Sequence, residues 1–270
     1  MASKIYKNLI SIIVVSLNTK KEFLKTIKSI QKQVCKNYEI IVVDGKSTDG
    51  TIEIIKKFKK KFAKIVIEED RGIYDAMNKG TELASGNWVI FLNSGDIFYN
   101  KNVILNIFKS LFLSKKIDIL FGDTIVKNRN LNYLIQGNDL NKKVVMMPFC
   151  HQSTVTKTEL LKKNKFDLNY KISSDFNLFL ELLKQKKIFH KLKLTISEVN
   201  SEGLSDNNRL RVFYENYRIL KKNKLINGKI FLLLLFYCYI LLVKLLKILL
   251  PTYLVNIILK IKYKNLLINK

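Results

Sequence analysis

Two carboxylates in this sequence follow directly on apolar runs. Asp44 follows residues 39–43, and Asp96 follows residues 88–92 after the turn Asn93-Ser94-Gly95. Ligands of open α/β sheets bind outside the carboxyl ends of the strands, so acids in these places favour a binding site. Carboxylate oxygens suit hard divalent cations, which makes Asp96 a candidate metal ligand. The alternative for Asp96 is an ordinary Asx turn that closes a strand.

Charged residues also stand at the beginning of two predicted helices. Asp70 and Arg71 precede a helix that is expected to begin after Gly72, and Asp75 lies in its first turn. Asp175 lies in the first turn of a predicted helix over residues 174–184. An acid there also suits the positive end of a helix dipole, so Asp175 has a purely structural explanation as well.

The elements that must position these residues follow from hydrophobic periodicity. The first hundred residues alternate between short apolar runs and amphipathic stretches, which is typical of a doubly wound, mostly parallel α/β sheet. The predicted strands cover residues 9–16, 39–43, 65–67 and 88–92, and the predicted helices cover 20–33, a stretch including 52–58, and a stretch from after residue 72 to about 85. Further on, we expect a helix over 103–113, a strand over 118–121, a meander or hairpin over 124–147 and the helix over 174–184.

Composition narrows the class of protein. The chain has 270 residues, 48% of them hydrophobic, and a net charge of +26. Such a charge favours nucleic acid, anionic lipid head groups or phosphorylated substrates as partners. Lysine, isoleucine and asparagine are abundant along the whole chain, however, so a general bias in composition is an alternative explanation of the charge. Three widely spaced cysteines, Cys35, Cys150 and Cys238, indicate reduced thiols in a cytosolic setting.

The last quarter of the chain differs from the rest. Residues 201–229 predict a basic helical connector, and residues 230–243 are apolar but too short to span a bilayer unaided. Lys244 and Lys247 share a helix face, and a second amphipathic stretch follows Pro251. This pattern predicts membrane-associating helices over 230–270 that lie in the interface. A single tilted span, or a packing or dimer helix, is the alternative.

Three stretches in order resemble the family 2 glycosyltransferases, which are inverting enzymes with the GT-A fold. They are similar in particular to the bacterial branch that makes colanic acid and other surface polysaccharides, and the likeness covers about residues 1–200. The stretches are Ser11-Ile12-Ile13-Val14-Val15-Ser16-Leu17-Asn18, Ile41-Val42-Val43-Asp44-Gly45-Lys46-Ser47-Thr48-Asp49-Gly50-Thr51, and Asp70-Arg71-Gly72-Ile73-Tyr74-Asp75-Ala76-Met77-Asn78-Lys79-Gly80 through Asn93-Ser94-Gly95-Asp96.

The resemblance implies a site for a nucleotide-sugar donor. In the family, the first strand's end and the acidic turn after the second hold the nucleoside. Many relatives have two successive acids in that turn, whereas here Gly45 follows Asp44. The implied donor-binding residues are Ser16, Asn18, Asp44, Asp70, Arg71, Asp75 and Ser94.

It also implies a metal ligand and a general base. The family's Asp-X-Asp motif corresponds to Ser94-Gly95-Asp96, which leaves Asp96 as the expected ligand of Mg²⁺ or Mn²⁺. Asp175 corresponds to the acid that deprotonates the acceptor hydroxyl, in a Ser174-Asp175 pair where relatives have Glu-Asp. His151 and Gln152 match a His-Gln pair of this branch and are expected near the acceptor or the pyrophosphate.

We therefore expect a metal-dependent glycosyltransferase on the cytoplasmic face of the bacterial inner membrane. It would be peripheral and would transfer sugar from a nucleotide donor to a lipid-linked saccharide. One alternative is a GT-A-like protein that binds nucleotide sugars or acts as a scaffold without catalysis. A more distant alternative is a nucleic-acid-binding protein, which no motif supports.

Overall fold

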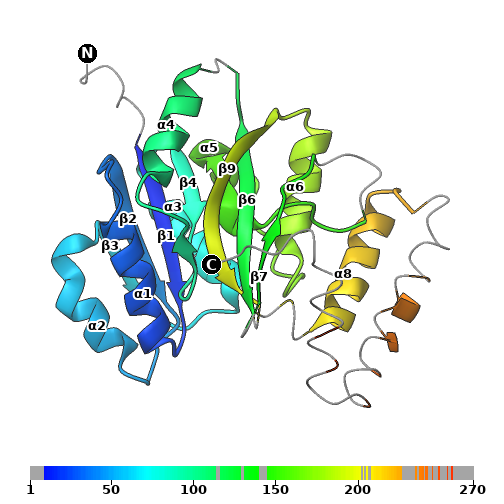
Figure 1. Ribbon diagram of the computed structural model, residues 1–270, viewed down its shortest axis with the longest axis horizontal. Helices are drawn as coiled ribbons and strands as arrows, with labels where there is room; N and C mark the ends of the chain where they lie inside the picture. Colours follow the sequence, from blue (N-terminus) through cyan, green and yellow to red (C-terminus); the bar gives the residue numbers. More distant parts are fainter. Residues whose placement is uncertain are drawn as a thin grey trace.

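The computed structural model describes residues 9–113, 116–128, 131–139, 145–201, 203, 205, 208–226 and scattered positions between 235 and 257. Its described part forms a nine-stranded sheet in the order β3-β2-β1-β4-β8-β6-β9-β5, with β7 paired to β6. Figure 1 shows helices on both sides of this sheet, with α2 and α8 at opposite sides of the molecule.

The first half of the sheet is parallel, as the alternating pattern predicts. β2 pairs with β1 and β3, and β4 pairs with β1 on its other side, all in parallel register. The carboxyl ends of β1, β2 and β4 therefore meet at one edge. The elements are β1 (Ile10–Ser16), α1 (Lys20–Gln31), β2 (Tyr38–Asp44), α2 (Thr51–Phe58), a 3₁₀ turn (Lys59–Lys61), β3 (Lys64–Ile67), α3 (Ile73–Leu83) and β4 (Trp88–Phe91).

The second half is mixed, so the expectation of a mostly parallel sheet is wrong there. β8 runs antiparallel to both β4 and β6, whereas β9 returns parallel to β6. Neither β8 nor β9 is predicted from the sequence, because β8 is short and half threonine, and β9 interrupts its apolar residues with lysines and other polar residues. The elements are β5 (Ile97–Phe98), α4 (Val103–Leu113), β6 (Ile119–Asn128), β7 (Leu131–Ile135), a 3₁₀ turn η3 (His151–Ser153), β8 (Thr154–Lys157), α5 (Thr158–Lys163), α6 (Ser174–Lys184), β9 (Phe189–Asn200) and α8 (Arg209–Lys222).

The sheet separates two hydrophobic cores. Ile13 of β1 packs with residues of α3 and α6 on one face, and Ile12 packs with residues of α1 and α4 on the other. A Cβ at Gly80 would lie 2.5 Å from Cγ2 of Ile13, so only glycine allows α3 to approach β1 this closely. Residues 88–92 are buried throughout, as a strand covered on both faces requires.

Helix α8 packs on the sheet domain. Ile219 and Leu220 are fully buried, in the same core as residues of α6. The division of the chain at residue 200 stays a prediction. Among the described residues, none of the helices has both the length and the apolar character that crossing a bilayer requires. Much of the expected membrane segment, including Lys244 and Lys247, lies outside the described residues.

Candidate active site

The turn after β2 is organised by Asp44. Its side chain is fully buried, and both carboxylate oxygens accept hydrogen bonds. Ser16 Oγ donates to Oδ2 (2.7 Å), Ser47 N–H donates to Oδ1 (2.7 Å), and Ser47 Oγ donates to Oδ2 (2.7 Å). The carboxylate thus shapes the turn from within, and its direct contact with a nucleoside stays a prediction.

The loop after β1 is joined to this turn and to the loop after β4. Asn18 has a left-handed backbone (φ 52°), and its Oδ1 accepts the N–H of Thr48 (2.7 Å). Asn18 N–H donates to Oγ of Ser47 (2.8 Å). On the other side, Thr19 Oγ1 donates to Oγ of Ser94 (2.7 Å). Three of the predicted donor-site segments therefore form one connected edge.

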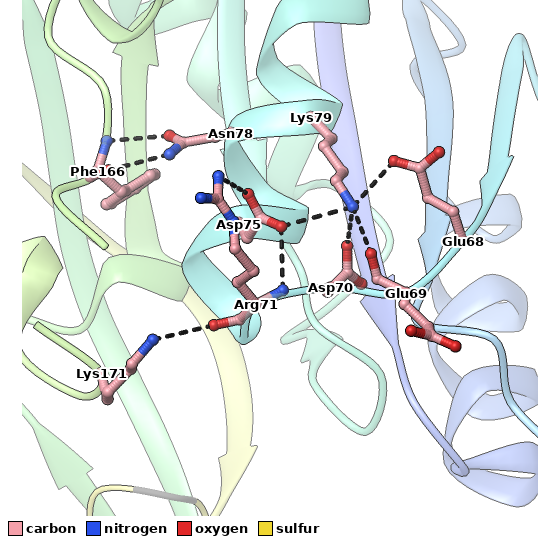
Figure 2. Close-up of polar contacts among 9 residues, drawn as sticks. All are labelled: Glu68, Glu69, Asp70, Arg71, Asp75, Asn78, Lys79, Phe166 and Lys171. Atoms are coloured by element: carbon pink, nitrogen blue, oxygen red, sulfur yellow. Dashed lines mark hydrogen bonds and ion pairs between the residues drawn. The ribbon is translucent and has the colours of Figure 1, made fainter. Parts of the chain in front are cut away.

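Lys79 of α3 contacts the charged segment that precedes this helix (Figure 2). Its ammonium group lies 2.6 Å from Asp70 Oδ1, 2.9 Å from Glu68 Oε1 and 3.5 Å from Asp75 Oδ2. It also donates to the backbone carbonyl of Glu69 (2.8 Å). Burial alone would lower the pKa of Lys79, but the hydrogen bonds that its ammonium donates to Asp70 and Glu68 raise the pKa above its usual value. Lys79 is therefore a permanent cation that holds this segment on α3.

Arg71 is an exposed cation beside this group. Its side chain is 77% exposed, although its Nη2 lies 3.4 Å from Asp75 Oδ1. Asp75 also accepts the backbone N–H of Arg71 (3.0 Å). Burial alone would raise the pKa of Asp75, but this bond, Arg71's guanidinium and Lys79 lower it. Asp70 Oδ2 would lie 3.2 Å from a Cβ at Gly45, so its carboxylate occupies the space beside the glycine that replaces the second acid of relatives.

Asp175 and His151 are in contact. His151 Nδ1 lies 3.0 Å from Asp175 Oδ2, and His151 Nε2 lies 3.3 Å from Nδ2 of Asn93. The hydroxyl of Tyr74 lies 3.0 Å from Asp175 Oδ1 and donates to the carbonyl of Ile172 (2.6 Å). Burial, and next the charge of Asp175, raises the pKa of Tyr74 well above its usual value, so Tyr74 stays a neutral donor.

Asp96 faces the same His-Gln pair. Its side chain is buried, and this burial raises its pKa to about 7 against the opposing effects of His151 and of a hydrogen bond from Gln152. Thr26 of α1 fixes the turn, because its Oγ1 donates to the Asp96 carbonyl (2.7 Å) and accepts the N–H of Gly95 (2.9 Å). The predicted base and the predicted metal ligand thus share His151 as a neighbour.

The residues fit a metal that is shared with a substrate. Among the described residues, no three His, Cys, Asp or Glu side chains form a cluster that could hold a metal ion. Mg²⁺, however, is commonly bound by one or two carboxylates together with substrate phosphates. Asp96, a buried carboxylate with no Lys or Arg in contact in the described part, fits this second arrangement.

The structure adds residues to which the sequence analysis gives no role. Asn93 contacts His151, and its buried Oδ1 has no hydrogen-bond partner among the described residues. The position of Asn93 directly after the predicted strand over residues 88–92 could have identified it as a candidate site residue. Lys79 and Tyr74 also lie inside the quoted motif. The partners of Lys79 lie within residues 68–75, whereas Tyr74 contacts Ile172 and Asp175, which are distant in sequence.

The chain belongs to glycosyltransferase family 2, because the model of that family, "Glycosyl transferase family 2", matches residues 11–156. A PGL/p-HBAD biosynthesis glycosyltransferase of Mycobacterium tuberculosis is 30% identical over 173 residues, which cover 62% of this chain and 66% of the relative. The UDP-Glc:alpha-D-GlcNAc-diphosphoundecaprenol beta-1,3-glucosyltransferase WfgD of Escherichia coli is 27% identical over 196 residues, covering 67% of this chain and 72% of WfgD.

Solved structures show the same GT-A-like fold. Residues 1–349 of S. aureus TarS, in complex with UDP-GlcNAc, match with a TM-score of 0.61 and 19% identity, over 78% of this chain and 64% of that one. The mannosyltransferase PcManGT of Pyrobaculum calidifontis, in complex with GDP-Man and Mn²⁺, matches with a TM-score of 0.63 and 16% identity, over 81% and 64%. The chain thus spans just under two thirds of the length of the mycobacterial relative and of these two structures.

Proposed function

We propose that this protein transfers a sugar from a nucleoside diphosphate donor to a saccharide hydroxyl, with inversion at the anomeric carbon, during synthesis of a bacterial surface polysaccharide. One observation carries the proposal: Asp175 and Asp96, from segments far apart in sequence, both neighbour His151 at the carboxyl edge of the sheet. The proposed reaction needs a base for the acceptor hydroxyl and a cation ligand for the donor phosphates, and these two groups must lie close to each other.

The mechanism follows from the roles of these residues. The acceptor hydroxyl gives its proton to the Asp175 carboxylate, and its oxygen attacks the anomeric carbon opposite the leaving phosphate. The bond from that carbon to the phosphate oxygen breaks, and the nucleoside diphosphate leaves with its negative charge. Contacts from His151 and Tyr74 orient the Asp175 carboxylate during this step.

The donor would lie along the edge formed by the loops after β1, β2 and β4. Arg71 is exposed and cationic, which suits a phosphate or sugar hydroxyl. Asp96 would hold Mg²⁺ or Mn²⁺ together with the donor phosphates. When bound, this ion would neutralise charge on the leaving group.

A lipid-linked acceptor at the cytoplasmic membrane face fits two further observations. The name of WfgD describes transfer to a diphosphoundecaprenol-linked sugar. At the described positions of the tail, large apolar side chains are exposed, and exposed apolar groups of this kind often mark contact surfaces. They are Leu235, Tyr237, Tyr239, Leu241, Leu242, Leu245, Leu249 and Ile257.

Asp175→Asn tests the proposed base. The amide keeps the size of the side chain but does not take up the proton, so kcat should fall on the order of 10²-fold or more while donor affinity changes little. Turnover is measured as release of nucleoside diphosphate, for the nucleotide sugar that most stabilises the protein thermally with Mn²⁺. Donor binding without any turnover in the unaltered protein would instead favour a non-catalytic nucleotide-sugar-binding protein.

A further inference from the structure

A buried carboxylate on α8 binds the segment that leads into α6. Glu215 is 2% exposed, and it accepts three consecutive backbone N–H groups. Lys171 N–H donates to Oε1 (3.0 Å), whereas the N–H groups of Ile172 and Ser173 donate to Oε2 (2.9 and 3.0 Å). Arg211, one turn earlier on α8, donates its Nε–H to Oε1 (3.0 Å). All the hydrogen bonds found for this carboxylate in the described part therefore go to the α6 segment or to its counter-ion.

Glu215 is ionised at neutral pH. Burial alone would raise its pKa, but the three backbone N–H groups and Arg211 together lower it. Hydrogen bonds to an ionised acceptor are about twice as strong as neutral ones. The segment 171–173 is therefore held firmly against α8.

This segment ends where the proposed base begins. Ser173 directly precedes α6 and makes no side-chain capping bond, and Asp175 is the second residue of that helix. Opposite Glu215, the Tyr74 hydroxyl holds the carbonyl of Ile172 and contacts Asp175. Glu215 and Tyr74 thus fix the same short segment through its N–H and C=O groups respectively.

We infer that Glu215 is a positioning residue, which sets the place of Asp175 by holding residues 171–173. It contacts none of the reacting atoms. The inference rests on the proposed function, and it extends the catalytic unit to α8, beyond residues 11–156 that the family model matches. A purely structural role for Glu215 would change stability without a separate effect on turnover.

Glu215→Gln tests the inference. Glutamine keeps the size but offers one acceptor oxygen in place of two, and its NH₂ group would face backbone N–H groups. We expect kcat for nucleoside diphosphate release to fall by about 10- to 100-fold, since misplacing a catalytic group by about 1 Å can cost 10²-fold. The donor KM should change by less than about twofold, because substrate binding is not altered. Hydrogen exchange at the amides of residues 171–173 should become faster.

Glu181→Gln is the matched control. It makes the same chemical change on α6, where Glu181 lies 3.6 Å from Lys184 at the far end of the helix from Asp175. We expect kcat and the exchange of residues 171–173 to stay as in the unaltered protein. Faster exchange in Glu215→Gln with an unchanged kcat would overturn the positioning role, and so would unchanged exchange.

Two further variants keep the result interpretable. If Glu215→Gln does not fold, Arg211→Gln leaves the carboxylate in place but removes its counter-ion; a smaller loss in kcat at constant donor KM supports the inference, and no loss overturns it. Asp175→Asn is the reference for the proposed function. If that variant keeps full turnover, the assignment of the base fails, whatever Glu215 does to the segment.

Discussion

Asp96 and Asp175 have unlike surroundings although both neighbour His151. Asp175 Oδ1 faces the Tyr74 hydroxyl and accepts the N–H of Phe176 (2.8 Å), and Oδ2 faces His151. Asp96 is buried, and this burial raises its pKa to about 7. Two carboxylates in different environments can take two roles, here proton acceptor and cation ligand.

The raised pKa of Asp96 predicts that its ionised carboxylate destabilises the folded protein when no ligand is bound. The native state keeps a proton on Asp96 between about pH 4 and pH 7 that the unfolded state has lost, so stability declines as pH rises through this range. Asp96→Asn should therefore raise the Tm at pH 8, measured without metal or donor, and the gain should shrink between pH 7 and pH 5. An equal or lower Tm at pH 8 would contradict this account.

The same substitution should remove the proposed cation contact. Titration of Asp96→Asn with Mn²⁺ and the donor should show donor binding that no longer depends on the metal, and transfer should be lost. Glu181→Gln serves as the control again, because Glu181 lies at the far end of α6 from Asp175, and it should keep both the metal-dependent binding and the transfer. Full activity of Asp96→Asn at micromolar metal would exclude the assignment.

At the scale of single residues, the sequence motifs predict which residues lie together in the site, but not the contacts that each of them makes. His151, Gln152, Asp96 and Asp175 do meet in space. The burial of Asp44 and the role of Glu215 could not be predicted. A carboxylate that binds backbone N–H groups from another element leaves no periodic signal in the sequence.

At the scale of elements, α3 contacts both the predicted donor-binding residues before it and the segment 166–175, which contains the proposed base. Lys79 holds Glu68, Asp70 and Asp75, whereas Asn78 exchanges two hydrogen bonds with the backbone of Phe166 (2.9 Å each). Figure 2 shows both sets of contacts on the same helix, with Lys171 reaching the carbonyl of Arg71. A change on α3 can therefore affect both substrates.

Lys79→Met should weaken donor binding more than it slows turnover. Three acids would lose their shared cation and repel one another, so the segment that carries Arg71 should shift. We expect the donor Kd, measured by calorimetry, to rise by about 10-fold or more, since a lost charged hydrogen bond is worth about 1.5–3 kcal/mol. Lys165→Met is the control, because Lys165 pairs with Glu82 at an exposed site (2.9 Å). Equal affinities of the two variants would exclude this role of Lys79.

The parallel half of the sheet was predictable for a physical reason. Buried parallel strands are uniformly apolar, and the helices between them show one apolar stripe, so both periods are visible. β8 pairs antiparallel with both of its neighbours. β9 is partly exposed, and its Leu192 and Leu194 alternate with lysines. Their partners are distant in sequence, and the mixed topology follows from pairing that local patterns do not encode.

At the scale of the whole molecule, α8 links the catalytic part to the tail. Its inner face carries Glu215, Ile219 and Leu220, all buried. Phe213, two turns before Leu220, is partly buried against the same core, and the centroid of its ring lies 5.2 Å from that of Tyr237 in the tail. If the basic, apolar tail holds the protein at an anionic membrane, the proposed base Asp175 would stay close to a lipid-linked acceptor.

Two truncations separate these roles of α8 and the tail. A variant ending at Ile226 keeps α8 and the partly buried Leu225 and Ile226, which pack on the core. It should fold, bind the donor and release nucleoside diphosphate at a near-normal rate. It should lose sedimentation with anionic vesicles and activity mainly toward lipid-linked acceptors.

A variant ending at Asn200 should behave differently, because it also loses Glu215 and two fully buried side chains of α8. We expect a large loss in Tm, since removing a buried Leu or Ile typically costs about 2–5 kcal/mol, and a loss of turnover with every acceptor. Differential scanning calorimetry and nucleoside diphosphate release measure the two effects. If this shorter variant were as stable and as active as the one ending at Ile226, α8 would be a linker and not a part of the catalytic unit. If the longer variant kept full activity on lipid-linked acceptors, the tail would have no part in their use.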